Sequence, residues 1–229
     1  MKKIEMKSII RGIIVLVFFT YSYLLQYIPV YLFHIDVNLL KNHYTLVVLL
    51  STFSSLIAFL VLFLIYHKDL VNDFIEFRKD TLTKMNDGIT CWIIGLMVMF
   101  ASNIIISLLF HTGGANNEKA VQSLISAYPI IMGISVCFLA PFNEELVFRK
   151  TLYDVFHNRK VFIVLSFLLF GYVHVSSMAE SLVDWLYIIP YGALGASFAV
   201  AYSKTKTVYT SMCLHMIHNT MLFLLSVFM

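Results

Sequence analysis

Seven apolar stretches, each long enough to cross a lipid bilayer, dominate this chain of 229 residues. A transmembrane helix needs about 20 consecutive, mostly apolar residues. The mean hydropathy of +0.84 and a charged fraction of only 13% are far from those of a soluble domain. The sequence therefore predicts an all-α, polytopic transmembrane bundle of about seven helices. Its expected spans lie near residues 10–31, 45–66, 89–110, 126–148, 161–178, 185–202 and 207–228.

The basic residues predict which ends of these spans face the cytoplasm, because cytoplasmic loops are enriched in lysine and arginine. Of the 16 basic residues, all but Lys41 and Lys119 precede the first span or lie in the second, fourth or sixth connection. This distribution predicts a multi-pass protein of the cell membrane, with its N-terminus in the cytoplasm and its C-terminus outside.

Two parts of the chain are expected from the spacing of the spans. Residues 1–110 would form three N-terminal transmembrane helices with a cytoplasmic loop at 67–88, and residues 126–228 would form a core of four. The loop mixes charges with apolar residues, so it would be either an amphipathic helix at the membrane surface or a solvated loop helix. Residues 111–119, which include two glycines and two asparagines, read as an external loop.

Two adjacent acids, Glu144 and Glu145, end an apolar run where a carboxylate is costly. An intramembrane acid is a functional-site hypothesis by default. Arg149 is four residues after Glu145 and can pair with it on one helix face, while Glu144 points elsewhere and could face a polar cavity. Pro141 lacks a backbone donor, which favours a local kink or a wet pocket here. Taken alone, these charges are better explained as a helix end at the headgroups.

Two later spans carry further polar groups. His174 lies in the 161–178 span, one helical turn from Phe170 and on the same face. His215 and Asn219 share a face of the last span, and His218 lies beside them. Packing or hydrogen bonding between helices is an alternative for each of them. A carboxylate, imidazoles and an amide on separate spans together favour hydrolytic chemistry inside the bilayer.

Other site classes find no match in the sequence. There is no H-E-x-x-H zinc motif, Ser135 lacks the glycine expected after a rhomboid-type serine, and Asp154 and Asp184 are not placed mid-span like an aspartyl pair. The three cysteines form no C-x-x-C pair, and no basic patch indicates nucleic-acid binding.

Three motifs in order resemble the CPBP family of CAAX proteases and bacteriocin-processing enzymes, also called the Abi or type II CAAX prenyl endopeptidase family. Residues Glu144-Glu145-Leu146-Val147-Phe148-Arg149 resemble its EExxxR motif, Phe170 to His174 its FxxxH motif, and His215 to Asn219 its HxxxN motif. The resemblance covers residues 126 to 225, and the first three spans are not diagnostic of the family.

The resemblance implies an intramembrane endopeptidase that cuts a membrane-associated peptide or protein at a site open to the cytoplasm. Glu144 would be the general base, aided by His174 in activating water, and His215 and Asn219 would bind the developing oxyanion. Glu145 and Arg149 would support the site, and His218 is an additional neighbour. In a bacterium, to which the residue usage points, the role would be peptide maturation or self-immunity to bacteriocins.

Three questions stay open at this point. Glu144, His174 and His215 could instead hold a divalent metal such as zinc, because two histidines and a carboxylate are a known ligand set; a metalloprotease-type enzyme with an undetermined metal is therefore expected. A transporter using these groups as a proton relay is an alternative, although no repeated half with broken helices is visible. A non-enzymatic immunity or scaffold protein is the third.

Overall fold

The computed structural model describes residues 6–25, 31 and 44–228, and these contain helices and no strand. The all-α prediction is therefore confirmed. The α-helices are α1 (Met6–Leu25), α4 (Tyr44–Lys79), α5 (Thr81–Phe110), α6 (Asn116–Ala127), α7 (Pro129–Ile134), α8 (Ala140–Glu145), α9 (Leu152–Val155), α10 (Arg159–Val175), α11 (Ile188–Thr205) and α12 (Val208–Phe228). Two π-helical segments, η1 (Ser135–Leu139) and η2 (Leu146–Thr151), and a 3₁₀ turn, η3 (Asp184–Tyr187), complete the described chain.

Five helical stretches of the described chain are long and apolar enough to cross a membrane: Thr45–Lys79, Thr81–Phe110, Pro129–Val155, Asp184–Thr205 and Val208–Phe228. They coincide with five of the predicted spans. The predicted fifth span corresponds to α10, which is 17 residues long. The predicted first span corresponds to α1, and its last part, beyond Leu25, lies outside the described residues apart from Tyr31.

Two of the predicted connections contain helix. The segment 67–88 is helical, as both alternatives for it expected, but it is not a separate helix, because α4 continues to Lys79 and α5 starts at Thr81. The predicted external loop at 111–119 reaches only to residue 115, where α6 begins. Lys2, Lys3 and Lys41, which entered the charge argument, lie outside the described residues.

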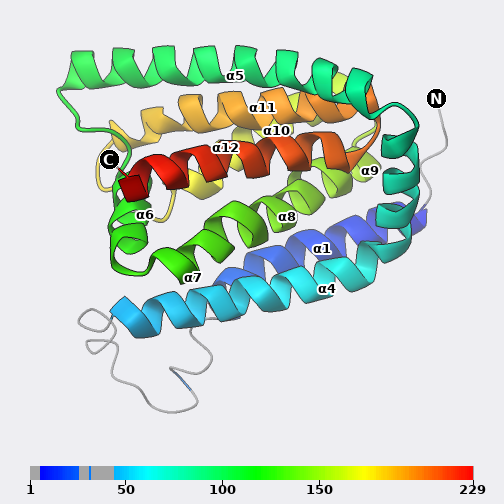
Figure 1. The fold of residues 1–229 in the computed structure, drawn as a ribbon, viewed down its shortest axis with the longest axis horizontal. Helices are drawn as coiled ribbons and strands as arrows, with labels where there is room; N and C mark the ends of the chain where they lie inside the picture. The colour runs from blue at the N-terminus through cyan, green and yellow to red at the C-terminus, as the bar shows by residue number, and fades with distance from the viewer. Residues whose placement is uncertain (1–5, 26–30, 32–43, 229) are drawn as a thin grey trace.

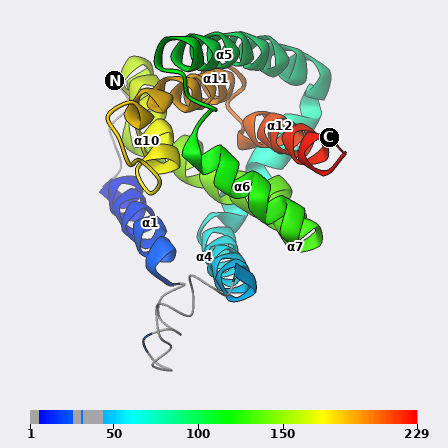
Figure 2. The ribbon, with the colours of Figure 1, turned by 90° about the vertical axis from the view of Figure 1, so that its left-hand side faces the viewer.

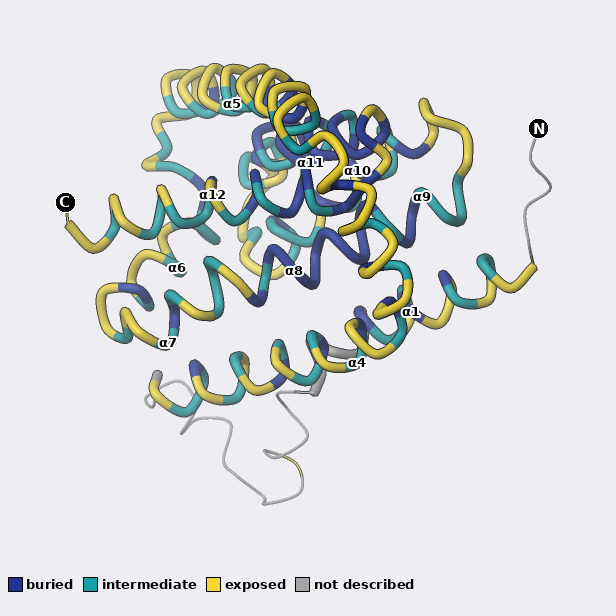
Figure 3. Tube along the Cα trace, turned by 45° about the vertical axis from the view of Figure 1, so that its right-hand side comes forward, coloured by how far each residue is buried: buried dark blue, intermediate teal, exposed yellow. Residues whose placement is uncertain are grey.

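The continuous helical stretch from α7 to α9, which carries Glu144 and Glu145 and is called the site helix, runs through the middle of the bundle. It has α1 and α4 on one side and α12, α10 and α11 on the other (Figures 1 and 2). The long helix α5 lies over α11 at the top of Figure 1. Buried residues gather on α8, η2 and α11, whereas α5 and α4 carry many exposed positions (Figure 3). Apolar side chains exposed on outer helices are what a lipid-facing surface requires.

Close packing of α10 against α11 depends on Gly171 and Gly195. A Cβ on Gly171 would lie 2.7 Å from the carbonyl oxygen of Ile188, and a Cβ on Gly195 would lie 2.7 Å from that of Ser166. Small residues let two membrane helices approach to backbone contact. The pairing holds His174 on α10 against the start of α11.

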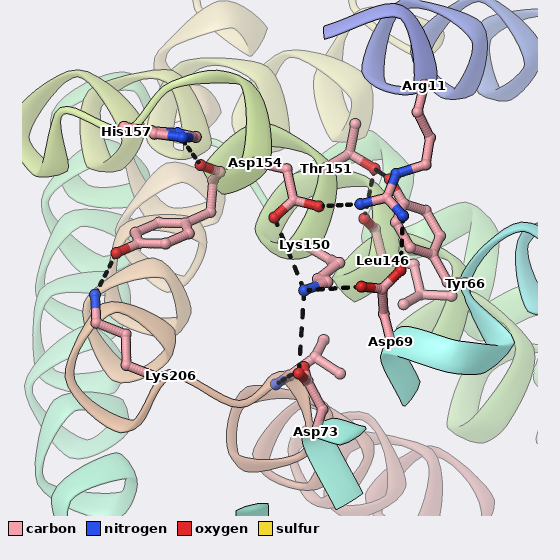
Figure 4. Close-up of polar contacts among 12 residues, drawn as sticks. Arg11, Tyr66, Asp69, Asp73, Leu146, Lys150, Thr151, Asp154, His157 and Lys206 are labelled. Carbon is pink, nitrogen blue, oxygen red and sulfur yellow. Dashed lines mark hydrogen bonds and ion pairs between the residues drawn. The ribbon is translucent and has the colours of Figure 1, made fainter. Parts of the chain in front are cut away.

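The two ends of the bundle differ in composition. The basic end is formed by residues 79–81, 156–158 and 206–207, at the right of Figure 1, and the α6 end is formed by residues 111–129 and 176–184, at its left. At the basic end Arg11 bridges Asp69 and Asp154 with two 2.7 Å ion pairs, and Lys150 lies among the same acids (Figure 4). These charges tie α1 and α4 to the end of the site helix.

Candidate active site

The two glutamates lie on a helix whose hydrogen-bonding pattern changes on both sides of them. The π-helical segments η1 and η2 flank α8, which ends at Glu145. Pro141 lies two residues after the end of η1, and a wider turn accommodates its missing N–H and its ring. Such π-bulges occur often at functional sites, because they re-aim the side chains of the surrounding turns. The irregularity expected near Pro141 is therefore a π-turn.

Glu145 lies inside the protein and fixes two partners. Its Oε2 atom lies 3.2 Å from Nε of Arg149, and its Oε1 atom lies 2.9 Å from Nδ1 of His215. The side chains of Glu145 and Arg149 are both 0% exposed. The Arg149 guanidinium lies over the rings of Phe170 and Phe198, at 4.8 and 5.4 Å from their centroids. The predicted Glu145–Arg149 pair is confirmed, and it is fully buried.

Glu144 points the other way and faces both motif histidines. Its Oε2 atom lies 3.9 Å from Nε2 of His174 and 3.8 Å from Nε2 of His215. These distances are too long for direct hydrogen bonds, and this oxygen is buried without a hydrogen-bond partner among the described residues. Nδ1 of His174 lies 2.8 Å from the carbonyl oxygen of Phe170. Its N–H can donate there, which leaves Nε2 toward Glu144.

The last span completes the group. Asn219 donates from Nδ2 to the carbonyl oxygen of Val136 in η1, at 2.9 Å, so the amide is held against the π-segment. His218 packs edge-on against Trp92 with a centroid distance of 6.3 Å. The structure thus brings together side chains that lie up to 75 residues apart in the sequence. This agrees with the prediction that three separate spans contribute polar residues to one site.

One cavity joins these groups. It has a volume of about 610 Å³, and Glu144, His174, His215, His218 and Asn219 all line it. Apolar side chains make up much of the remaining wall. A concave, mostly apolar space with a few convergent polar groups is the usual form of a small-molecule or peptide site.

Three lining residues were not found by sequence reasoning. Tyr191 of α11 stacks on His174 with a centroid distance of 4.8 Å, and Asn117 of α6 donates to its hydroxyl at 3.4 Å. Glu118 lines the same cavity. The sequence signal was weak: Tyr191 lies in the predicted span 185–202, whereas Asn117 and Glu118 lie in a segment predicted to be a loop.

The three residues predicted as metal ligands lie in this cavity. Glu144, His174 and His215 offer donor types that zinc accepts. Among the residues that the structure describes, however, no three histidine, cysteine or acidic side chains form a group able to hold a metal ion. A divalent metal at these residues therefore stays a prediction, and no chemical step is assigned to one.

Comparisons with known proteins agree with the motifs. Residues 126–221 match the family model described as type II CAAX prenyl endopeptidase Rce1-like. The "Putative membrane peptidase YdiL" of Bacillus subtilis is 26% identical over 54% of this chain and 50% of its own length. The UPF0177 protein YajF of Lactococcus lactis is 28% identical over 58% of this chain and 65% of its own. No solved structure matches the chain.

The matched region contains the five polar residues Glu144, His174, His215, His218 and Asn219 of the cavity wall. The chain spans only about half to two thirds of the length of these two relatives. Residues 126–221 of this multi-pass membrane protein are thus similar to the Rce1-like family of type II CAAX prenyl endopeptidases.

Proposed function

We propose that this protein is an intramembrane endopeptidase that hydrolyses a peptide bond in a membrane-associated peptide or protein. The observation that carries the proposal is the Glu144 carboxylate, which faces the Nε2 atoms of His174 and His215 at 3.9 and 3.8 Å within one cavity. The similarity of residues 126–221 to a protease family supports the reaction class. The geometry supports the residues that would perform it.

Water activation follows from the spacing of these atoms. A gap of nearly 4 Å between polar atoms is one that a water molecule can bridge. Glu144 would take a proton from that water, with His174 orienting it, while the water oxygen attacks the peptide carbonyl. When the C–N bond breaks, Glu144 would return the proton to the leaving amine. A positioned general base of this kind contributes roughly 10²- to 10⁴-fold in rate.

The oxyanion would be bound from α12. His215 has its Nδ1 atom beside the Glu145 carboxylate at 2.9 Å, so its Nε2 atom is the one that points into the cavity. With the ring protonated, Nε2–H can donate to the oxyanion, and Glu145 balances the ring charge. Asn219 uses one amide hydrogen on Val136 and retains a second. Donors held in place before the reaction stabilise the transition state without reorganising.

The substrate would be apolar near the scissile bond, because the cavity wall is largely apolar. The family resemblance adds peptide maturation or self-immunity to bacteriocins as the cellular role. The metalloprotease-type class stays a prediction, which the comparison with and without a chelator decides, because no group of three metal-binding side chains is found among the described residues.

The test is cleavage of a panel of hydrophobic peptides by the purified protein in detergent. Wild type is compared with Glu144→Ala and His174→Ala, each with and without a chelator. Loss of cleavage in both variants, with folding retained, is expected. Cleavage that survives Glu144→Ala would overturn the mechanism, and loss on chelation that a single metal restores would establish a metalloenzyme.

A further inference from the structure

The cavity that holds Glu144 extends toward one end of the bundle only. Its wall is formed by the second half of α5, the 113–115 linker, α6, the last turns of α10, the first turns of α11 and the second half of α12. In Figure 1 these segments converge on the left, where α6 lies and the chain ends. Residues such as Gly113, Glu118 and Ser226 line the cavity at that α6 end.

A second, smaller hollow points in the same direction. It touches His174 from the side of Asn117, Met178 and Asp184, which belong to α6 and to the connection between α10 and α11. The two hollows share Ala115, Asn117 and His174, so both lie on the α6 side of the histidine.

The opposite side of Glu144 is closed by protein. Glu145, Arg149 and Phe198 are 0% exposed and Phe170 is 2% exposed, and together they form a floor below His215. Beyond this floor, the ion pairs among Arg11, Asp69, Lys150 and Asp154 join the helices at the basic end (Figure 4). No residue of that network lines the cavity.

The charges show which end faces the cytoplasm. Within the described part of the chain, Lys119 is the one basic residue at the α6 end, and the remaining lysines and arginines lie toward the basic end. Cytoplasmic segments carry the excess of lysine and arginine. The closed, basic end therefore faces the cytoplasm, and the α6 end faces outward.

We propose that the catalytic cavity opens to the non-cytoplasmic face of the membrane, and that its substrates are apolar peptide segments presented from outside. This is the reverse of the cytoplasmic opening implied by the family resemblance. The substrate class rests on the proposed peptidase function, whereas the direction of access does not.

Access is measured by cysteine labelling of the full chain in intact cells with a membrane-impermeant maleimide. Ala140→Cys places a thiol on the cavity wall one turn before Glu144. Lys119→Cys and Lys204→Cys place exposed thiols at the α6 end and the basic end. Mass spectrometry locates each label, so the natural Cys91, Cys137 and Cys213 serve as internal references.

External reagent is expected to label Lys119→Cys and Ala140→Cys, and to label Lys204→Cys only after the membrane is permeabilised. Ala140→Cys that stays unlabelled from outside overturns the proposal, as does a Lys204→Cys thiol that labels in intact cells. If Ala140→Cys does not accumulate, Val173→Cys repeats the measurement from the α10 wall, because cysteine is close to valine in size and Val173 also lines the cavity.

A vesicle experiment separates this inference from the proposed reaction. An apolar peptide added to right-side-out vesicles should be cleaved, and the same peptide added to inverted vesicles should not. Cleavage confined to inverted vesicles would refute outward access. External labelling of Ala140→Cys without cleavage in either orientation would refute the peptidase function and leave outward access standing.

Discussion

Replacing Arg149 by methionine tests whether a buried charge pair holds the site helix. The two side chains of the Glu145–Arg149 pair are 0% exposed and their charged atoms are 3.2 Å apart. Methionine keeps much of the packing against Phe170 and Phe198 but removes the positive charge. Glu145 is then a buried carboxylate whose remaining hydrogen-bond partner is His215, and removing one member of a buried pair typically costs about 3–5 kcal/mol.

The expected loss converts into a large change in melting temperature. For a chain of this size, 1 kcal/mol corresponds to about 2–4 °C in Tm, so Arg149→Met should lower Tm by roughly 6–20 °C. The double variant Glu145→Leu/Arg149→Met removes both charges, and a buried pair replaced by apolar residues is often neutral. Its Tm should return close to that of wild type, while its peptidase activity stays lost because His215 no longer has its carboxylate partner.

The assay is thermal unfolding of the purified variants in detergent, followed by tryptophan fluorescence. Lys79→Met is the matched control, because the Lys79–Glu76 pair also lies on one helix but its side chains are 63% and 49% exposed. Exposed ion pairs contribute little, so this variant should keep the Tm of wild type. A Tm of Arg149→Met equal to that of the control, or a double variant no more stable than the single, would refute the reasoning.

Three further predictions concern single positions. Gly171→Ala should lower the free energy of unfolding by about 1–3 kcal/mol, because its Cβ would meet the Ile188 carbonyl oxygen at 2.7 Å. Gly113→Ala is the control and should leave Tm unchanged, because its Cβ would meet only the flexible end of Lys119 at 3.5 Å. Asn219→Ala should lower kcat about 10²- to 10³-fold with little change in KM; an effect on KM alone would assign it to substrate binding. Asn158→Ala should cost about 1 kcal/mol, since its side chain caps α10 by accepting from two backbone N–H groups at 3.0 and 3.2 Å.

Local spacing accounts for the parts of the site that the sequence predicted. Residues four apart on a helix share a face, which is why the Glu145–Arg149 pair and the Phe170–His174 stack, with centroids 4.3 Å apart, could be expected. Glu144 and the histidines were predicted to converge because polar side chains on separate spans face one another rather than lipid.

Contacts between distant segments account for what was missed. Nothing in the spacing shows that Glu145 would partner His215, 70 residues away, because that contact depends on how α8 and α12 pack. The helix α6 was read as a loop because glycines and asparagines crowd its start; it is a short helix of 12 residues. Such a helix is marginal alone and is stabilised by packing of its apolar face, here through Ile125.

The continuation of α4 was missed for a related reason. The charges of residues 67–79 suggested solvent, but Asp69 accepts an ion pair from Arg11 at 2.7 Å, and Asp73 accepts a hydrogen bond from the backbone N–H of Val208 at 3.1 Å. Tertiary partners therefore satisfy charged residues on a helix that extends beyond the apolar span.

The central claim is that the Glu144 carboxylate acts as the base in this cavity, and Glu144→Gln tests it most directly. Glutamine keeps the size and the packing of the side chain but cannot accept the proton. In peptide-cleavage kinetics on protein reconstituted in lipid, kcat is expected to fall at least about 100-fold with Tm unchanged. A Glu144→Gln protein that cleaves at the wild-type rate would contradict the account.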